Sequence, residues 1–283
     1  MVNKLINQLM KFNFKRSARV VLSIMSIILG KYSKFRFVKN RYWVQEQAGR
    51  HFVDLSPNYR FKISEVDELC SDIYFYKYKP KEGDICIDIG AGIGTEALIT
   101  SELINSRGRL LAVEANTKTF EALELLKEFN RLENMEVFRY AISDTNDSVK
   151  ITTQTEHHIE NKIISIDDME EDSKETFDIV DARTMDQFLL ENQVPYIDYL
   201  KVNIEGAEKM LIKSFDQIKN VKNIAISCHD FLSIRTGDNS FSTKSDVTDF
   251  LKSHEFEIEC QNTGVDYIDD WVYGINKKTN IRT

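Results

Sequence analysis

From Lys81 onward, short apolar runs alternate with stretches of helical periodicity. A short apolar run suits a strand that is buried on both faces, and helices between such runs are typical of an α/β fold with a mostly parallel sheet. We expect strands over residues 85–89, 110–113, 137–141, 200–204 and 224–228, followed by a late pair over 256–260 and 271–275. The pattern therefore predicts a seven-stranded sheet with flanking helices.

Glycines concentrate where the first of these strands ends. Asp88 is followed by Gly90, Gly92 and Gly94, and we expect a helix to begin near Thr95. A dinucleotide-binding GxGxxG fingerprint would need its third glycine at position 95. An acid at the strand end would also repel phosphate. The sequence therefore disfavours a nicotinamide-dependent dehydrogenase.

A second acid, Glu114, follows the second predicted strand. A carboxylate at this place can accept hydrogen bonds from both hydroxyls of a ribose, and Asp88 favours a cationic ligand. A nucleoside that carries a positive charge is S-adenosylmethionine (SAM). We therefore predict a SAM site formed by Asp88, Gly90, Gly92, Gly94 and Glu114. The alternative is an ordinary tight turn that Asp88 orders.

These motifs resemble the FkbM family of SAM-dependent methyltransferases, and three further segments narrow the resemblance. They are Thr184-Met185-Asp186 before a helix, the block Leu200-Lys201-Val202-Asn203-Ile204-Glu205-Gly206-Ala207-Glu208, and Ser227-Cys228-His229 at a strand end. The resemblance covers roughly residues 84–260. It implies a Rossmann-like methyltransferase fold with SAM as the cofactor.

Two positions depart from the family's pattern. Asn203 stands where the family has Asp, and Ser227 stands where the family has a Glu before its x-His. Asn retains hydrogen-bonding capacity but lacks the negative charge. The resemblance thus implies an intact cofactor half, with Asn203 among the cofactor-binding residues, and an altered acceptor half.

Further candidate residues follow the later strands. Asp144 lies where proteins of this fold class usually contact the adenine of SAM. Equally, Asp144 could serve only to form a turn. Glu205 and Glu208 open a helix, where acids favour the positive end of the dipole, so we take Glu208 as structural and Glu205 as a site residue. His229 ends a buried strand, and histidine is the most common general base in enzymes, so it is the candidate for that role, or else a satisfied strand-end histidine. We predict His229 and Glu205 as catalytic residues.

The resemblance implies O-methylation of a hydroxyl on a sugar, glycan or secondary metabolite. The rival hypothesis is a catalytically weakened protein that keeps the fold and acts as a membrane-associated binding or assembly partner; Asn203 and Ser227 motivate it. No metal site is predicted, because the four cysteines form no CxxC pair. They are typical of buried thiols in a reducing compartment, so we expect a cytoplasmic protein, with a homo-oligomer as an open alternative.

Charge is divided unevenly along the chain. Residues 1–45 contain ten basic and no acidic residues, so the net charge of −8 leaves −18 on residues 46–283. The acidic balance argues against a nucleic-acid partner. The apolar run over residues 20–29 is too short to span a bilayer, which takes about 20 residues. Flanked by cations, it suits either peripheral contact with an anionic membrane through residues 1–41 or packing as a helix.

Three parts of the chain are therefore expected. Residues 1–40 form a basic amphipathic helical arm, and residues 81–283 form the methyltransferase domain. Residues 41–80 form an accessory hairpin or cap, because aromatic and β-branched residues alternate with polar ones and a turn at Ser56-Pro57-Asn58 precedes a strand-like segment over 59–63. The acidic stretch over 145–177 is expected to be a solvated insert or a lid.

Overall fold

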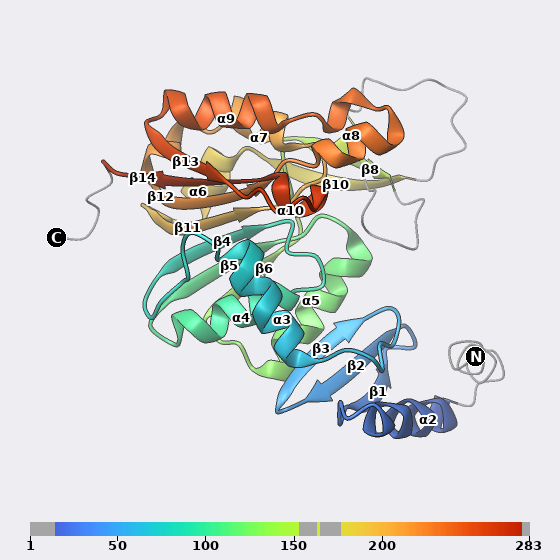
Figure 1. The fold of residues 1–283 in the computed structure, drawn as a ribbon. Helices are drawn as coiled ribbons and strands as arrows, with labels where there is room; N and C mark the ends of the chain where they lie inside the picture. Colours follow the sequence, from blue (N-terminus) through green and yellow to red (C-terminus); the bar gives the residue numbers. More distant parts are fainter. Residues whose placement is uncertain (1–14, 153–162, 165–176, 279–283) are drawn as a thin grey trace.

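The computed structural model describes residues 15–152, 163–164 and 177–278, and a seven-stranded sheet forms its centre (Figure 1). The strand order is β13-β14-β12-β11-β4-β5-β6. Only β14 runs antiparallel to its neighbours, which confirms the predicted fold class. The strands are β4 (Ile85–Ile89), β5 (Arg109–Val113), β6 (Met135–Phe138), β11 (Ile197–Val202), β12 (Val221–Ser227), β13 (Phe256–Cys260) and β14 (Trp271–Asn276).

Helices cover both faces of this sheet. One face packs against α3 (Ile63–Leu69), the π-helical turn Cys70–Tyr74, α4 (Thr95–Ile104) and α5 (Thr117–Asn130). The other packs against α6 (Met185–Glu191), α7 (Glu208–Lys213) and α9 (Lys244–Ser253). Short helices α8 (Asp230–Thr236) and α10 (Asp266–Asp269) and 3-10 turns at Asp216–Asn220 and Asn239–Phe241 connect the later elements. Because side chains alternate along a strand, Cys86 faces the first helical layer while Ile87 and Ile89 face the second.

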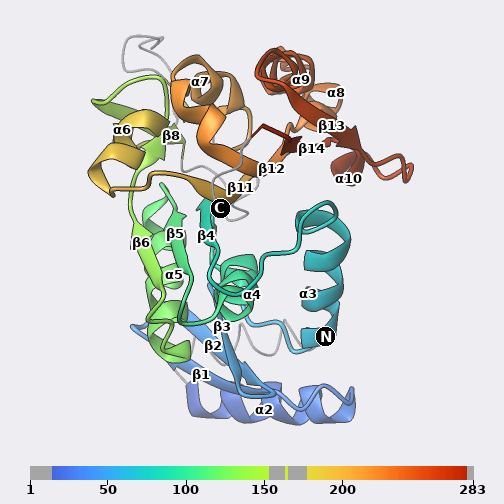
Figure 2. The ribbon, with the colours of Figure 1, turned by 90° about the vertical axis from the view of Figure 1, so that its left-hand side faces the viewer.

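A small antiparallel sheet adds a further layer beyond α4 and α5. Its strands are β1 (Lys34–Val38), β2 (Tyr42–Gln47) and β3 (Arg50–Asp54). Apolar residues of β2 and β3 pack on α5, and the opposite face of the sheet packs on α2 (Lys15–Ile28). Figure 2 shows α2 as the outermost layer at this end of the molecule.

The N-terminal part differs from the sequence-based expectation in one strand. Residues 59–63 form no strand, and the third strand is β1, which lies within the predicted arm. The side chain of Gln47 explains the difference. Its Oε1 accepts the backbone N–H of Ile63 at 2.6 Å, where α3 begins, and its Nε2 donates to the Lys31 carbonyl at 2.6 Å. The segment after the turn is thus fixed by a side chain instead of by a strand ladder.

The predicted strand over 137–141 is divided between two sheets. β6 ends at Phe138, and β7 (Ala141–Ile142) pairs with β10 (Phe177–Arg183) in a four-stranded sheet of order β7-β10-β8-β9. The other two strands are β8 (Ser148–Thr152) and β9 (Ile163–Ile164). The acidic stretch thus contributes β8 and β9 to this sheet, and its residues 153–162 and 165–176 lie outside the described residues.

Candidate functional site

A cavity of about 170 Å³ lies at the carboxyl ends of β4, β5 and β11. Open α/β sheets bind ligands in this crevice. The lining consists of Ile89, Gly90, Gly92, Val113, Glu114, Ala115, Asn116, Thr119, Tyr140, Ala141, Ile142, Ile151, Asn203, Ile204 and Glu205. Of the residues predicted from the sequence, the cavity brings together Gly90, Gly92, Glu114, Asn203 and Glu205.

The turn after β4 depends on its glycines for two different reasons. Gly90 has φ +74°, and a Cβ there would lie 1.9 Å from the carbonyl oxygen of Asn203, so only glycine lets the ends of β4 and β11 approach. Gly94 does not line the cavity. A Cβ at Gly94 would lie 2.4 Å from Cδ1 of Leu123, so this glycine lets α4 pack closely against α5.

Glu114 fastens this turn to the start of α5. Its carboxylate accepts hydrogen bonds from the backbone N–H of Gly92 at 2.8 Å, the N–H of Asn116 at 2.8 Å and the hydroxyl of Thr119 at 2.9 Å. Burial raises the pKa of Glu114 above its ordinary value, although these hydrogen bonds oppose the shift. The two carboxylate oxygens have four lone pairs, and these three hydrogen bonds use three of them, so Oε2 can accept one ribose hydroxyl in addition.

Asp88 lies beneath the turn and outside the lining of the cavity. Its Oδ1 is 2.8 Å from Nζ of Lys201, and both side chains are buried; the same Nζ donates to the Gly90 carbonyl at 2.9 Å. Burial raises the pKa of Asp88, and the ammonium of Lys201 opposes the shift. Burial by itself would lower the pKa of Lys201, but the charge of Asp88 leaves it raised.

The position of Asp88 favours the loop-ordering role over direct contact with the cofactor. Lys201 was part of the family motif but received no role from the sequence. The sequence could have indicated a role in an ion pair, because a lysine within an otherwise apolar buried strand needs a charged partner.

Asn203 and Glu205 bring polar groups from β11 to the cavity. The backbone N–H of Asn203 donates to the Ile89 carbonyl at 2.9 Å, while its side-chain Oδ1 is buried and has no donor among the described residues. Glu205 has φ +52° and is followed by Gly206 at φ +95°, so the chain turns sharply after the strand. A buried acceptor without a donor suits a ligand that carries an ammonium group, as SAM does.

His229 does not line the cavity. It is 5% exposed, with Nδ1 3.0 Å from Oε1 of Glu208 and Nε2 3.5 Å from Oγ of Ser227. Glu208 is fully buried, and its Oε2 lies 3.1 Å from the hydroxyl of Thr243. Glu208 therefore orients the imidazole, a role that the sequence did not suggest because the two residues are separated by 21 positions.

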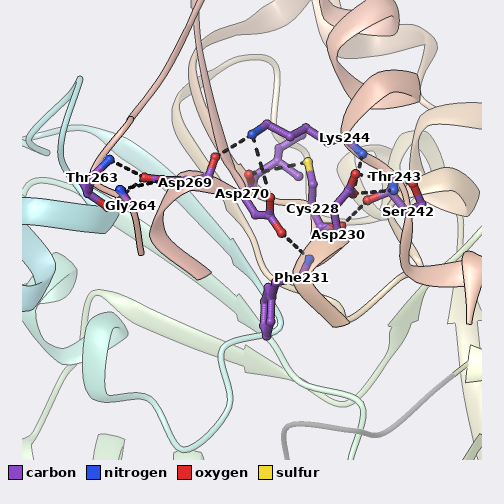
Figure 3. A network of polar contacts seen from close by, with 11 residues as sticks. Cys228, Asp230, Phe231, Ser242, Thr243, Lys244, Thr263, Gly264, Asp269 and Asp270 are labelled. Atoms are coloured by element: carbon purple, nitrogen blue, oxygen red, sulfur yellow. Dashed lines mark hydrogen bonds and ion pairs between the residues drawn. The ribbon is translucent and has the colours of Figure 1, made fainter. Parts of the chain in front are cut away.

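A network of polar contacts holds the chain that follows β12 (Figure 3). The hydroxyl of Thr243 donates to the Cys228 carbonyl at 2.6 Å, and Oδ1 of Asp230 accepts the backbone N–H of Thr243 at 2.8 Å. Oδ2 of Asp270 accepts the N–H of Phe231 at 2.6 Å. These contacts tie the backbone on both sides of His229 to the start of α9 and to the residue before β14.

Asp144, the predicted adenine contact, also lies off the cavity. Its carboxylate is partly exposed and lies 3.7 Å from Nζ of Lys213. The chain turns away after Ile142, because Ser143 donates its N–H to the Arg183 carbonyl of β10. Tyr140 and Ile142 build the cavity wall on this side. Tyr140, an aromatic residue just after a strand end, was the sequence feature that could have indicated this wall.

The fold and the cavity define the class of protein. The sheet reverses only at β14, the crevice lies at the carboxyl ends of the parallel strands, and the glycine turn is tied to an acid on the next strand. This is the arrangement of the Rossmann-like methyltransferases. Residues 88–258, more than half of the chain, match the model of the methyltransferase FkbM domain. The chain belongs to this family of SAM-dependent methyltransferases, and its cofactor is SAM.

Several solved methyltransferase structures are similar to this chain. An FkbM methyltransferase from Methylobacillus flagellatus KT is 15% identical, with 76% of this chain and 51% of that chain covered and a TM-score of 0.48. The precorrin-6y C5,15-methyltransferase of Geobacter metallireducens GS-15 is 15% identical, with coverages of 76% and 87% and a TM-score of 0.41. Aeropyrum pernix fibrillarin with natively bound SAM is 13% identical, with coverages of 83% and 94% and a TM-score of 0.44. A comparison with curated proteins gave no match.

Proposed function

We propose that the chain transfers the methyl group of SAM to a hydroxyl on a sugar, glycan or secondary metabolite. The observation that carries this proposal is one cavity whose lining includes the glycine turn, Glu114 and Glu205. When bound, SAM supplies an electrophilic methyl group on its sulfonium. The residues of the chain bind it, orient the acceptor and receive a proton.

Binding and orientation belong to the cofactor half. Oε2 of Glu114 would accept a ribose hydroxyl, and Oδ1 of Asn203 would accept a hydrogen bond from the ammonium group. The backbone of Gly90 and Gly92 would lie against the ligand, since both glycines line the cavity. Holding donor and acceptor at near-attack distance supplies about 7–11 kcal/mol of the barrier reduction in well-oriented reactions.

Glu205 has the position for proton transfer, because its side chain lines the cavity and a carboxylate can accept the hydrogen of an attacking hydroxyl. General base catalysis of this kind contributes about 10²–10⁴ to the rate. The role of His229 as the base stays a prediction, since its Nδ1 faces Glu208 and it lies outside the lining. The geometry supports Glu205 in that role, with His229 and Glu208 bracing the adjacent turn.

The test is methyl transfer from SAM with a labelled methyl group to a panel of sugars, glycans and hydroxylated small molecules. Glu205→Gln is expected to lower kcat about 10²- to 10⁴-fold while the Kd for S-adenosylhomocysteine is unchanged. Asp144→Asn is the matched control, because that acid lies off the cavity. Full activity of Glu205→Gln would refute the assignment of Glu205 as the general base. SAM binding without transfer to any acceptor class would favour the catalytically weakened partner role.

A further inference from the structure

Helix α2 carries apolar residues on two opposite faces. The inner face packs on the small sheet, where Ala18 and Leu22 are completely buried. The outer face presents Val20, Ile24 and Ile27, which are 57%, 50% and 53% exposed. These three residues recur at spacings of four and three positions, so they form one stripe along the helix. We call Val20, Ile24 and Ile27 the outer stripe.

The outer stripe differs from the exposed apolar residues on the elements around the central sheet. Ile179, Leu190 and Ile234 are 64%, 69% and 83% exposed, but they belong to β10, α6 and α8 and lie on separate elements. Singly exposed apolar residues are ordinary, whereas a continuous apolar stripe marks a surface that another body covers. Figure 1 shows α2 on the outside of the small sheet, with its outer side away from the other labelled elements.

Cations lie beside the outer stripe at the N-terminal end of the helix and on the neighbouring strand β1. Arg16 and Arg19 lie on the same side as the stripe, and together with Ile24 and Lys34 they line a groove between α2 and β1. No acidic residue occurs anywhere in residues 1–45. The face is therefore apolar along its centre and basic at its rim.

The charge pattern indicates what kind of body covers the outer face of α2. A parallel second copy of α2 would bring the basic N-terminal ends together, and an antiparallel copy would offer Arg16 and Arg19 no acid to pair with, because α2 contains none. An anionic lipid surface offers apolar chains for the stripe and negative headgroups for the rim. The helix cannot cross such a bilayer. None of the helices in the described part of the chain is long and apolar enough to do so, and α2 has 14 residues.

We propose that the outer face of α2, consisting of the outer stripe with Arg16 and Arg19, binds the surface of an anionic phospholipid bilayer. The helix lies in the plane of the headgroups, with its inner face still packed on the small sheet. The inner face of α2 is then the packing surface and its outer face the membrane contact, so the two explanations of this segment apply to different faces of one helix.

Flotation of the full chain with vesicles tests the proposal without cofactor or acceptor, so its outcome is independent of the proposed reaction. The chain is expected to float with phosphatidylcholine vesicles that contain phosphatidylglycerol and not with phosphatidylcholine alone. Flotation is expected to fall at about 1 M NaCl, where the Debye length is about 3 Å. Equal flotation with both vesicles would overturn the electrostatic part and with it the proposal.

Variants separate the outer stripe from the rest of the chain. Val20→Ser/Ile24→Ser/Ile27→Ser is expected to lose flotation and to keep the thermal unfolding of the unmodified chain, because these side chains are half-exposed. Arg16→Gln is expected to weaken partitioning about fivefold. The matched control changes three exposed apolar residues elsewhere and should float normally; it is Ile179→Ser/Leu190→Ser/Ile234→Ser.

Two results would overturn the proposal. One is normal flotation of the stripe variant, which would place any lipid contact elsewhere in the chain. The other is a dimer that dissociates in the stripe variant but never floats, which would make the outer face a contact between two copies.

Discussion

Gly90 and Gly92 offer a matched pair for measuring how closely the ends of β4 and β11 approach. Both have positive φ, +74° and +56°, and both line the cavity. They differ in what a methyl group would meet. A Cβ at Gly90 would lie 1.9 Å from the carbonyl oxygen and 2.8 Å from the carbonyl carbon of Asn203, whereas a Cβ at Gly92 has nothing within 4 Å.

The expected cost follows from these distances. An L-residue at positive φ costs about 1–2 kcal/mol, and this applies to Gly90→Ala and Gly92→Ala alike. Overlap with a neighbour that cannot move adds about 1–3 kcal/mol, and at position 90 the neighbour is backbone. Gly90→Ala should therefore lower the free energy of unfolding by about 2–5 kcal/mol, and Gly92→Ala by about 1–2 kcal/mol.

Urea unfolding followed by circular dichroism measures both values from the midpoint and slope of the transition. Thermal unfolding gives a second reading, since 1 kcal/mol corresponds to about 2–4 °C in Tm for a chain somewhat smaller than this one. If the two variants are equally stable within about 0.5 kcal/mol, the argument fails. The strand ends would then be farther apart than the structure places them, or Asn203 would be free to retreat.

Three further predictions concern the acids beside this turn. Glu114→Ala should abolish binding of S-adenosylhomocysteine in calorimetry, and unchanged affinity would remove the ribose assignment. Because burial raises the pKa of Glu114, lowering the pH should neutralise this carboxyl at a higher pH than an ordinary glutamate; the affinity should fall there, and titration calorimetry at several pH values measures it. Asp88→Asn should cost about 3–5 kcal/mol of unfolding free energy, because it leaves Lys201 buried without its partner. Combining Asp88→Leu with Lys201→Met should cost less, and a loss equal to that of Asp88→Asn would argue against an uncompensated charge.

The central sheet could be predicted because each strand is a local pattern. Ile85–Ile89 is an apolar run bounded by polar residues, and the structure gives it the predicted bounds. The small sheet was harder. In Lys34–Val38 cations alternate with Phe35 and Phe37, and the strand exists because those rings pack beneath α2. That contact joins two segments whose pairing no local pattern encodes.

The same distinction holds for the site. The sequence could place Gly90, Gly92 and Glu114 together, because each of them follows the end of a predicted strand, and all three line the cavity. The partnership of Lys201 with the Gly90 carbonyl bridges 111 positions, so it needed the folded sheet. Asp144 could not be placed in this way. It follows a strand as predicted, but the chain there enters a second sheet, and its carboxylate lies beside Lys213 and off the cavity.

The reversed strand has a consequence for the order in which the sheet can assemble. β13 pairs with no described strand other than β14, and β14 follows it in the sequence while lying between β13 and β12. During synthesis β13 therefore leaves the ribosome before any edge exists to receive it. The parallel strands can collapse first with the edge of β12 unpaired, and that edge is open to aggregation until β14 arrives to close it.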